Sequence, residues 1–253
     1  MSSPENASVG ADDLLIEDRA VPGGIVRVLT LNRPKRRNAL DSALHRDLLL
    51  ALDDADRNGE VRAVVLAGNG SVFCAGGDIK EFDGVSDAKD RLVERARLLT
   101  CLLSRFAVMS TPVVAAVSGA ALGAGAALMF ASDLAVAGED LMLGFPEIND
   151  GVVPAVVMAL AVRNLGRKHA FRMLTQGGSL DASEAQRYGL VADVVASKET
   201  LDTAVGIASI WAQRDPRALR ETKRLFYRVA DLSLDAGLQA GLDVTAATWR
   251  PRH

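Results

Sequence analysis

Ten consecutive residues combine a turn of small side chains with flanking acidic and basic groups, as anion-binding loops do. They read Phe73-Cys74-Ala75-Gly76-Gly77-Asp78-Ile79-Lys80-Glu81-Phe82. The small residues Ala75, Gly76 and Gly77 let a ligand approach bare backbone, and Asp78 suits the N-cap of a following helix. Unpaired N–H groups at a helix start attract an anion or a developing negative oxygen. A tight turn that uses glycine only for its dihedral angles accounts for the same residues equally well.

A second stretch of small residues, Ser118–Gly125 (SGAALGAG), follows an apolar run and precedes a helix-like run to Ala131. We expect the apolar run Thr111–Val117 to be a buried strand, and also the run Val61–Ala67 that precedes the first turn. Strand, small-residue turn and helix start therefore occur twice. Two such turns can direct their N–H groups at one oxygen, which is what an oxyanion hole requires.

Four ordered motifs resemble the crotonase (enoyl-CoA hydratase/isomerase) superfamily across residues 12–215. They read FCAGGDIKEF, TPVVAAVSGAALGAG, LGFPEINDGVVP and LDASEAQRYGLVADVV. The resemblance implies an oxyanion hole made by the backbone N–H groups of Gly77 and Ala124, which would hold the carbonyl of a CoA thioester. It also implies that Ala75, Asp78 and Ile79 belong to the substrate site.

A basic loop, Lys35-Arg36-Arg37, stands out in a chain whose net charge is −3. From the residues alone, a solvated loop is the favoured interpretation. In the superfamily this loop lies along the CoA nucleotide, so the resemblance implies that these side chains contact its phosphates. It further implies that the carbonyl of Ala39 accepts a hydrogen bond from the pantetheine amide.

The candidate proton carrier is Glu147, in the turn Pro146–Gly151. A glutamate in a turn is usually just solvated, but the resemblance assigns it the proton transfer at the substrate's carbons. Hydratases of the superfamily carry a second glutamate where this chain has Ala127, and residues 118–132 include no acid at all before Asp133. Asp150 has no support from the motif, and we treat it as a turn residue.

These residues favour Δ3–Δ2-enoyl-CoA isomerisation with Glu147 as the sole base, because efficient hydration generally uses two carboxylates. Hydration of 2-enoyl-CoA is the alternative. A degenerate acyl-CoA-binding protein with little turnover is a third hypothesis, favoured by the missing glutamate and opposed by the presence of Glu147 and both glycine turns. No cofactor is expected, since CoA is part of the substrate.

Composition narrows the remaining classes of partner and of cellular location. The 253 residues are 49% hydrophobic but only 4% aromatic, which predicts a large core of Ala, Val and Leu. The slight negative charge argues against nucleic-acid and membrane partners. Two cysteines and three scattered histidines make neither a disulfide framework nor a zinc signature, so we expect a cytoplasmic protein. Cys74 is interpreted as a packing residue and His45 as a surface residue of a helix.

The coarse pattern predicts an α/β fold, which the resemblance specifies as a crotonase-like spiral of ββα turns with a C-terminal helical trimerisation region. The corresponding division is a disordered leader at 1–12, a core at 13–197 and the helical region at 198–253. A homotrimer or a hexamer is implied. The further expected strands are Ile25–Leu31, Asp133–Ala137, Leu141–Phe145 and Leu190–Val195. Helices are expected at Asp41–Asn58, at Arg91–Ser110, at 154–176 with a break near Gly166, and over Lys198–Thr248 with a break at Pro216. One more helix is expected to begin at Asp181, which forms a capping box with Glu184.

Overall fold

The computed structural model of the chain describes residues 13–82 and 86–249. The expected leader, 1–12, lies outside the described residues. The core is a six-stranded sheet in the order β1-β2-β3-β4-β6-β9, in which β1 and β2 are antiparallel and all later neighbours are parallel. A second sheet has the order β5-β7-β8. The strands are β1 Leu14–Val21, β2 Gly24–Leu31, β3 Val61–Gly68, β4 Val113–Val117, β5 Ala120–Leu122, β6 Leu134–Gly138, β7 Met142–Gly144, β8 Ser179–Leu180 and β9 Asp193–Val195.

Helices cover both faces of the larger sheet, which explains why its central strands β3 and β4 carry no polar side chain apart from Arg62. In β3, Val64 and Leu66 belong to one core cluster, whereas Ala63 and Val65 belong to the other. The first cluster includes the buried faces of α1, α2 and α3, and the second is closed by α6. The helices are α1 Ser42–Arg57, α2 Ala88–Val108, α3 Ala124–Ala131, α4 Ala155–Gln176, α5 Ala182–Arg187, α6 Thr200–Ala212, α7 Pro216–Val229 and α8 Leu234–Thr248.

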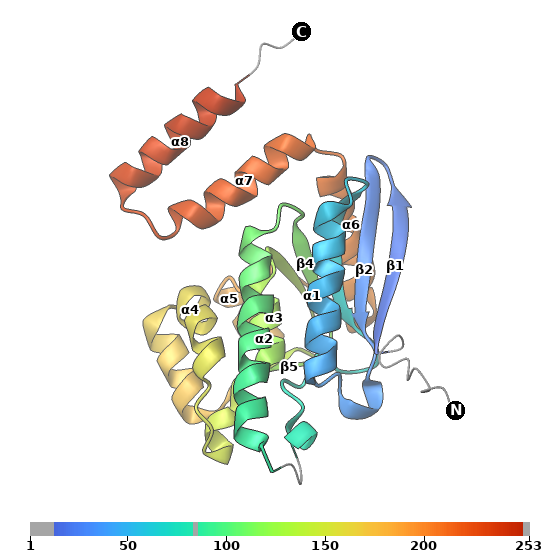
Figure 1. Cartoon of the computed structure of the whole chain (residues 1–253), viewed down its shortest axis with the longest axis vertical. Helices are drawn as coiled ribbons and strands as arrows, with labels where there is room; N and C mark the ends of the chain where they lie inside the picture. The colour runs from blue at the N-terminus through green and yellow to red at the C-terminus, as the bar shows by residue number, and fades with distance from the viewer. Residues whose placement is uncertain (1–12, 83–85, 250–253) are drawn as a thin grey trace, which may run out of the picture.

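The last two helices, α7 and α8, form a pair set apart from the sheet at the top of the view in Figure 1. One buried side chain anchors α7: Lys223 Nζ donates to Asp133 Oδ2 (2.8 Å) and to the Thr111 carbonyl (3.1 Å). Tyr227 adds a second bond to Asp133 (2.9 Å). No helix within 13–82 and 86–249 is long and apolar enough to span a membrane.

Most of the expected elements are present. The break near Gly166 is a residue with φ 68° and ψ 164° inside α4, and Asp181 and Glu184 do form the capping box of α5. The helical C-terminal part breaks before Pro216, where Asp215 caps α7.

Two expectations were wrong or incomplete, and one strand was not expected. The strand expected at Leu190–Val195 is only the short β9, because the chain joins the sheet edge late, after Ala192 bonds to β6. The first glycine turn leads not into an α-helix but into η2, a four-residue 3-10 helix at Ile79–Phe82. Strand β1 was not foreseen, since it is an edge strand with mostly exposed side chains and lacks an apolar pattern.

Candidate active site

The two small-residue turns pack backbone against backbone. Cys74 and Ala121 form a parallel bridge, in which the Cys74 N–H donates to Ala120 O (3.0 Å) and the Leu122 N–H donates to Cys74 O (3.0 Å). A Cβ on Gly125 would lie 2.3 Å from the Cys74 carbonyl oxygen, so only glycine permits this approach. The site is therefore built by backbone contact between segments that lie about fifty residues apart, as their numbering shows.

Gly77 and Ala124 both present backbone N–H groups that have no acceptor within the described part of the chain. On either side of Gly77 the backbone pairs with Leu40, since Leu40 N donates to Gly76 O (2.8 Å) and Asp78 N donates to Leu40 O (2.9 Å). Ala124 follows the N-cap Gly123 as the first residue of α3, where an N–H has no intrahelical acceptor. A Cβ on Gly76 would lie 3.7 Å from Ala124 N, so the two turns adjoin at this point.

Glu147 lies at the same place. It belongs to η3, a 3-10 helix at Pro146–Asp150 that directly follows β7. A Cβ on Gly123 would lie 2.6 Å from Glu147 Oε1, so the carboxylate lies against the residue that caps α3. Glu147 Oε2 is buried and has no hydrogen-bond partner among the described residues. Burial raises the pKa of Glu147, against a smaller opposing effect of its own backbone N–H.

Asp78 occupies a different environment from the one expected of a ligand-contacting residue. Its carboxylate is nearly buried and pairs with Arg33 (3.1 Å) and Arg36 (2.9 Å), and its Oδ1 accepts from the N–H of Lys80 (3.2 Å). Burial by itself would raise the pKa of Asp78, but the hydrogen bond from Arg36 and the charges of Arg33 and Arg36 outweigh it and lower that pKa. The side chain therefore ties the basic loop to the first glycine turn.

The basic loop is held in place by Arg33, a residue that the sequence did not single out. Its buried guanidinium donates to the Ala39 carbonyl (2.5 Å) and also pairs with Asp13 (3.1 Å) and Asp41 (2.9 Å). Beyond it, Pro34–Arg36 form η1, followed by a residue in the left-handed conformation. Long-range pairing of this kind has no signature in the local sequence.

The three expected phosphate ligands are not equivalent. Lys35 and Arg37 are exposed, and their side chains form no salt bridge with any described residue. Arg36 is half-exposed but already paired with Asp78. Of the remaining expected site residues, Ala75 is half-buried, Ile79 is 78% exposed although it is large and apolar, and Ala127 has no exposed surface at all.

His45 was expected on the surface, and this was wrong. Its side chain is 1% exposed because it lies on the buried face of α1 together with Leu44 and Leu48. Nδ1 bonds the Asp41 carbonyl (2.7 Å) and Nε2 has no partner among the described residues. Burial lowers the pKa of His45, so the ring is neutral at pH 7.

Cys74 was interpreted as packing, and the structure agrees. Its thiol is fully buried, and burial raises its pKa to about 12, which excludes a thiolate nucleophile. In the described ranges no cluster of three or more His, Cys, Asp or Glu residues could hold a metal ion.

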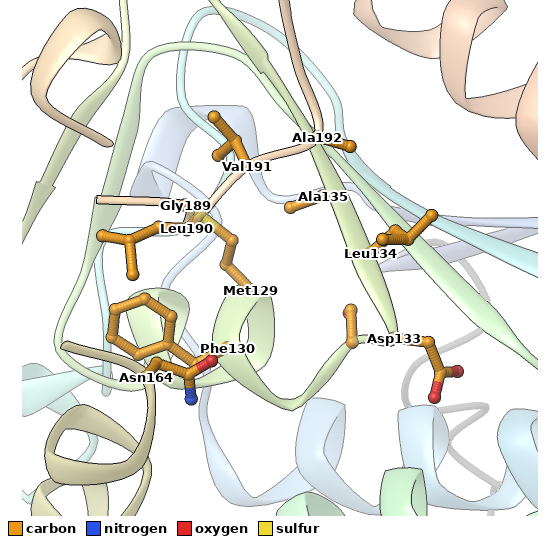
Figure 2. A pocket seen from close by; sticks show the side chains of 11 residues that line it. Met129, Phe130, Asp133, Leu134, Ala135, Asn164, Gly189, Leu190, Val191 and Ala192 are labelled. Atoms are coloured by element: carbon orange, nitrogen blue, oxygen red, sulfur yellow. The ribbon is translucent and has the colours of Figure 1, made fainter. Parts of the chain in front are cut away.

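A cavity of about 170 Å³ lies at the opposite end of α3 from Gly123. Figure 2 shows Met129, Phe130 and Leu190 on its wall, with the carboxylate of Asp133 pointing away from them. That carboxylate is already bonded to α7. No residue of the two glycine turns lines this cavity, so it is separate from the candidate active site.

A family model described as "Enoyl-CoA hydratase/isomerase" matches residues 22–252. The chain belongs to this family. As a member of the enoyl-CoA hydratase/isomerase family, it is 37% identical over 231 residues to the 2,3-dehydroadipyl-CoA hydratase of Escherichia coli (strain K12), covering 90% of this chain and 89% of that protein.

Solved structures of family members superpose closely on this one. The enoyl-CoA hydratase of Mycobacterium smegmatis matches with a TM-score of 0.87 at 34% identity, covering 93% of this chain and 90% of that one. The enoyl-CoA hydratase from Bacillus anthracis gives the same TM-score at 28% identity, with the same coverage. The protein is therefore a crotonase-superfamily enzyme with a mixed α/β core and a C-terminal helical region.

Proposed function

We propose that the protein acts on enoyl-CoA thioesters, with the N–H groups of Gly77 and Ala124 as the oxyanion hole and Glu147 as the proton carrier. The observation that carries this proposal is the position of Glu147. Its carboxylate, in which Oε2 has no partner among the described residues, lies against the N-cap of α3, next to one free N–H group and beside the turn that supplies the other. A buried polar atom without a partner is costly, which makes it a candidate for a functional group.

The two free N–H groups would polarise the thioester carbonyl and thereby acidify the C–H bond at C2. The charge of the resulting enolate falls on the oxygen in the hole, and losing one such donor typically costs about 10²–10³ in rate. Glu147, whose pKa is raised by burial, can take a proton and return it. Removal at C2 and return at C4 moves a 3-enoyl double bond into conjugation.

Isomerisation needs only this one carboxylate, and for that reason we favour it. The position that would carry a second acid is Ala127, which is fully buried in α3. The nearest acid in sequence after Glu147 is Asp150, which is exposed at the end of η3. Hydration of 2-enoyl-CoA is the second candidate, and the observation in its favour is that the relatives named above are hydratases.

Turnover assays separate these reactions, since conjugated enoyl thioesters absorb in the ultraviolet and hydrated products do not. Wild-type protein should convert 3-enoyl-CoA to 2-enoyl-CoA faster than it hydrates 2-enoyl-CoA. Rapid hydration without any shift of a 3-enoyl double bond would contradict the single-base proposal. Tight binding of both substrates with no turnover would instead favour a degenerate acyl-CoA-binding protein.

A structure with a bound acyl-CoA tests the hole directly. Both nitrogens, of Gly77 and of Ala124, should lie within about 3.1 Å of the thioester oxygen. A thioester oxygen that points elsewhere would refute the assignment.

On the CoA side, we propose that Lys35 and Arg37 bind phosphates, with Arg36 shared between CoA and Asp78. The carbonyl of Ala39 already accepts from Arg33 and retains a second lone pair for the pantetheine amide. Replacing Lys35 and Arg37 by Ala should weaken the binding of CoA thioesters about tenfold, as expected for exposed charge-assisted bonds. The binding of pantetheine thioesters, which lack these phosphates, should be unchanged. Equal weakening of both ligands would exclude a phosphate site.

Assembly into a homotrimer or hexamer is a further part of the proposal. Helix α8 exposes Leu234, Leu238 and Leu242 at four-residue spacing, by 77%, 65% and 61% respectively, and α7 exposes Phe226. An apolar stripe of this kind is costly in water unless another surface covers it. Sedimentation of the wild-type protein should show a trimer or hexamer, which should dissociate when Leu238 and Leu242 are replaced by Glu. A monomeric wild type would exclude the proposed assembly.

A further inference from the structure

Arg95, on α2, contacts the first glycine turn. Its Nη1 donates to the carbonyl oxygen of Asp78 (2.5 Å) and lies 3.3 Å from Glu81 Oε2. Only 12% of the side chain is exposed. The other carboxylate oxygen of Glu81 accepts from the N–H of Ser42 at the start of α1 (3.0 Å). The residues after Gly77 are thus held between the N-terminal half of α2 and the first turn of α1.

Gly77 is glycine for a reason that involves this arginine. Its φ lies outside the positive range that disfavours side chains, in contrast to the neighbouring Gly76 at φ 101°. Backbone conformation therefore does not require glycine at position 77. Instead, a Cβ there would lie 3.1 Å from Arg95 Nη2 and 3.3 Å from its Cζ. A Cβ at this position would therefore require the guanidinium or the turn to give by a few tenths of an ångström.

The packing of Arg95 against Gly77 limits how freely the Gly77 N–H can change direction. Glycine has the greatest backbone freedom of any residue, and an oxyanion donor works best when it is preorganised. Leu40 fixes the peptides on either side of Gly77 through two hydrogen bonds, and Arg95 fixes the Asp78 carbonyl and packs on the Gly77 Cα. Rotation at Gly77 would disturb one or the other of these contacts.

We propose that Arg95 is a positioning residue, which aims the Gly77 N–H at the thioester oxygen by holding the Gly77–Asp78 backbone from behind. This inference rests on the proposed function, because it takes Gly77 as an oxyanion donor. The guanidinium also places positive charge beside the site where negative charge develops. Arg95 does not itself touch the substrate, so its loss affects the strength of the hole more than the binding of CoA.

The test replaces Arg95 by Gln and uses Arg97→Gln as the matched control. Arg97 is on the same helix, but its side chain is 74% exposed, and within the described part of the chain its one salt bridge is to Glu94. Arg95→Gln should lower kcat about 10–100-fold, less than the loss typical of deleting a donor, and change KM little. The infrared carbonyl stretch of a bound ¹³C-labelled substrate-analogue thioester should shift less from its solution value than in wild type. Arg97→Gln should match wild type in both measurements.

A second variant keeps the inference testable if Arg95→Gln does not fold. Gly77→Ala leaves the arginine in place but pushes the guanidinium and the turn apart by a few tenths of an ångström. We expect kcat to fall about tenfold, since a misplacement of 1 Å can cost about 10²-fold. In an Arg95→Ala background, the same Gly77→Ala change should cost at most about twofold, because the space is vacated.

The outcomes separate this inference from the proposed function. If bound thioester in wild type shows no carbonyl shift and no enoyl-CoA is turned over, the proposed function fails. If wild type shows both, but Arg95→Gln or Gly77→Ala equals the Arg97→Gln control, only the role of Arg95 is refuted.

Discussion

The two carboxylates Asp78 and Glu147 of the candidate site have opposite environments. Asp78 receives two guanidinium groups and a backbone N–H, and these partners lower its pKa. Glu147 has one oxygen buried without any partner among the described residues, and burial raises its pKa. A carboxylate with all its partners fixes the shape of a loop, whereas one without partners is free to take up a proton. The comparison separates a group that holds the loops of the site together from the group that we propose as its proton carrier.

Replacing Glu147 by Gln should have the largest effect. The amide has nearly the same size but cannot accept the substrate's proton, so isomerisation should fall by about 10²–10⁴, the usual contribution of a general base. Binding of an acyl-CoA should survive, because the N–H groups are untouched. The control is Glu139→Gln, which alters an exposed carboxylate. Full activity of Glu147→Gln would remove this residue from the mechanism.

The substitution Gly123→Ala should have the next largest effect on activity. Gly123 has φ 53° and ψ −115°, a conformation that disfavours a side chain, and the added Cβ would lie 2.6 Å from Glu147 Oε1. Displacement of the carboxylate should lower kcat about 10²-fold. Gly178→Ala is the matched control, because nothing lies within 4 Å of its Cβ position and its φ is not positive. A Gly123→Ala enzyme as active as the control would mean that Glu147 is not held by this turn.

The backbone features of this site could be predicted from the sequence, whereas the side-chain network around it could not. Small residues after an apolar strand predict the two turns from the residues themselves, whereas the assignment of Gly77, Ala124 and Glu147 came from the family resemblance. Arg33 and Arg95 act on residues more than fifteen positions away, or from another helix, and no local pattern marks them.

His45 illustrates the same limit at the level of burial. A histidine at one position of an amphipathic helix can lie near the border of its apolar face, and only the packing of α1 decides on which side it falls. Strand β1 was missed because its side chains are mostly exposed, so that its pairing with β2 rather than its composition defines it.

The pH dependence should distinguish the two carboxylates in one experiment. The proposed mechanism requires ionised Glu147, so kcat should fall about tenfold per pH unit below a pKa that is raised from the ordinary 4.5. Asp78 has a lowered pKa, so its contribution to stability is complete above the ordinary 3.8 and is lost as the pH falls through the lower folded value. Inactivation should therefore precede acid unfolding. Circular dichroism and initial rates on one pH series would measure both, and coincident transitions would contradict the assignment.

The smallest expected effect concerns Asp150, the one other acid of η3. It is exposed at the end of that 3-10 helix, three residues after Glu147, whereas Glu147 Oε2 is buried. Asp150→Asn should therefore change kcat for isomerisation and for hydration by no more than about twofold, as surface substitutions usually do. Both rates should be measured on the same preparation, beside Glu147→Gln. A large loss of hydration alone would make Asp150 the second carboxylate for water, and the enzyme would then be a hydratase whose second acid has moved from α3 to η3.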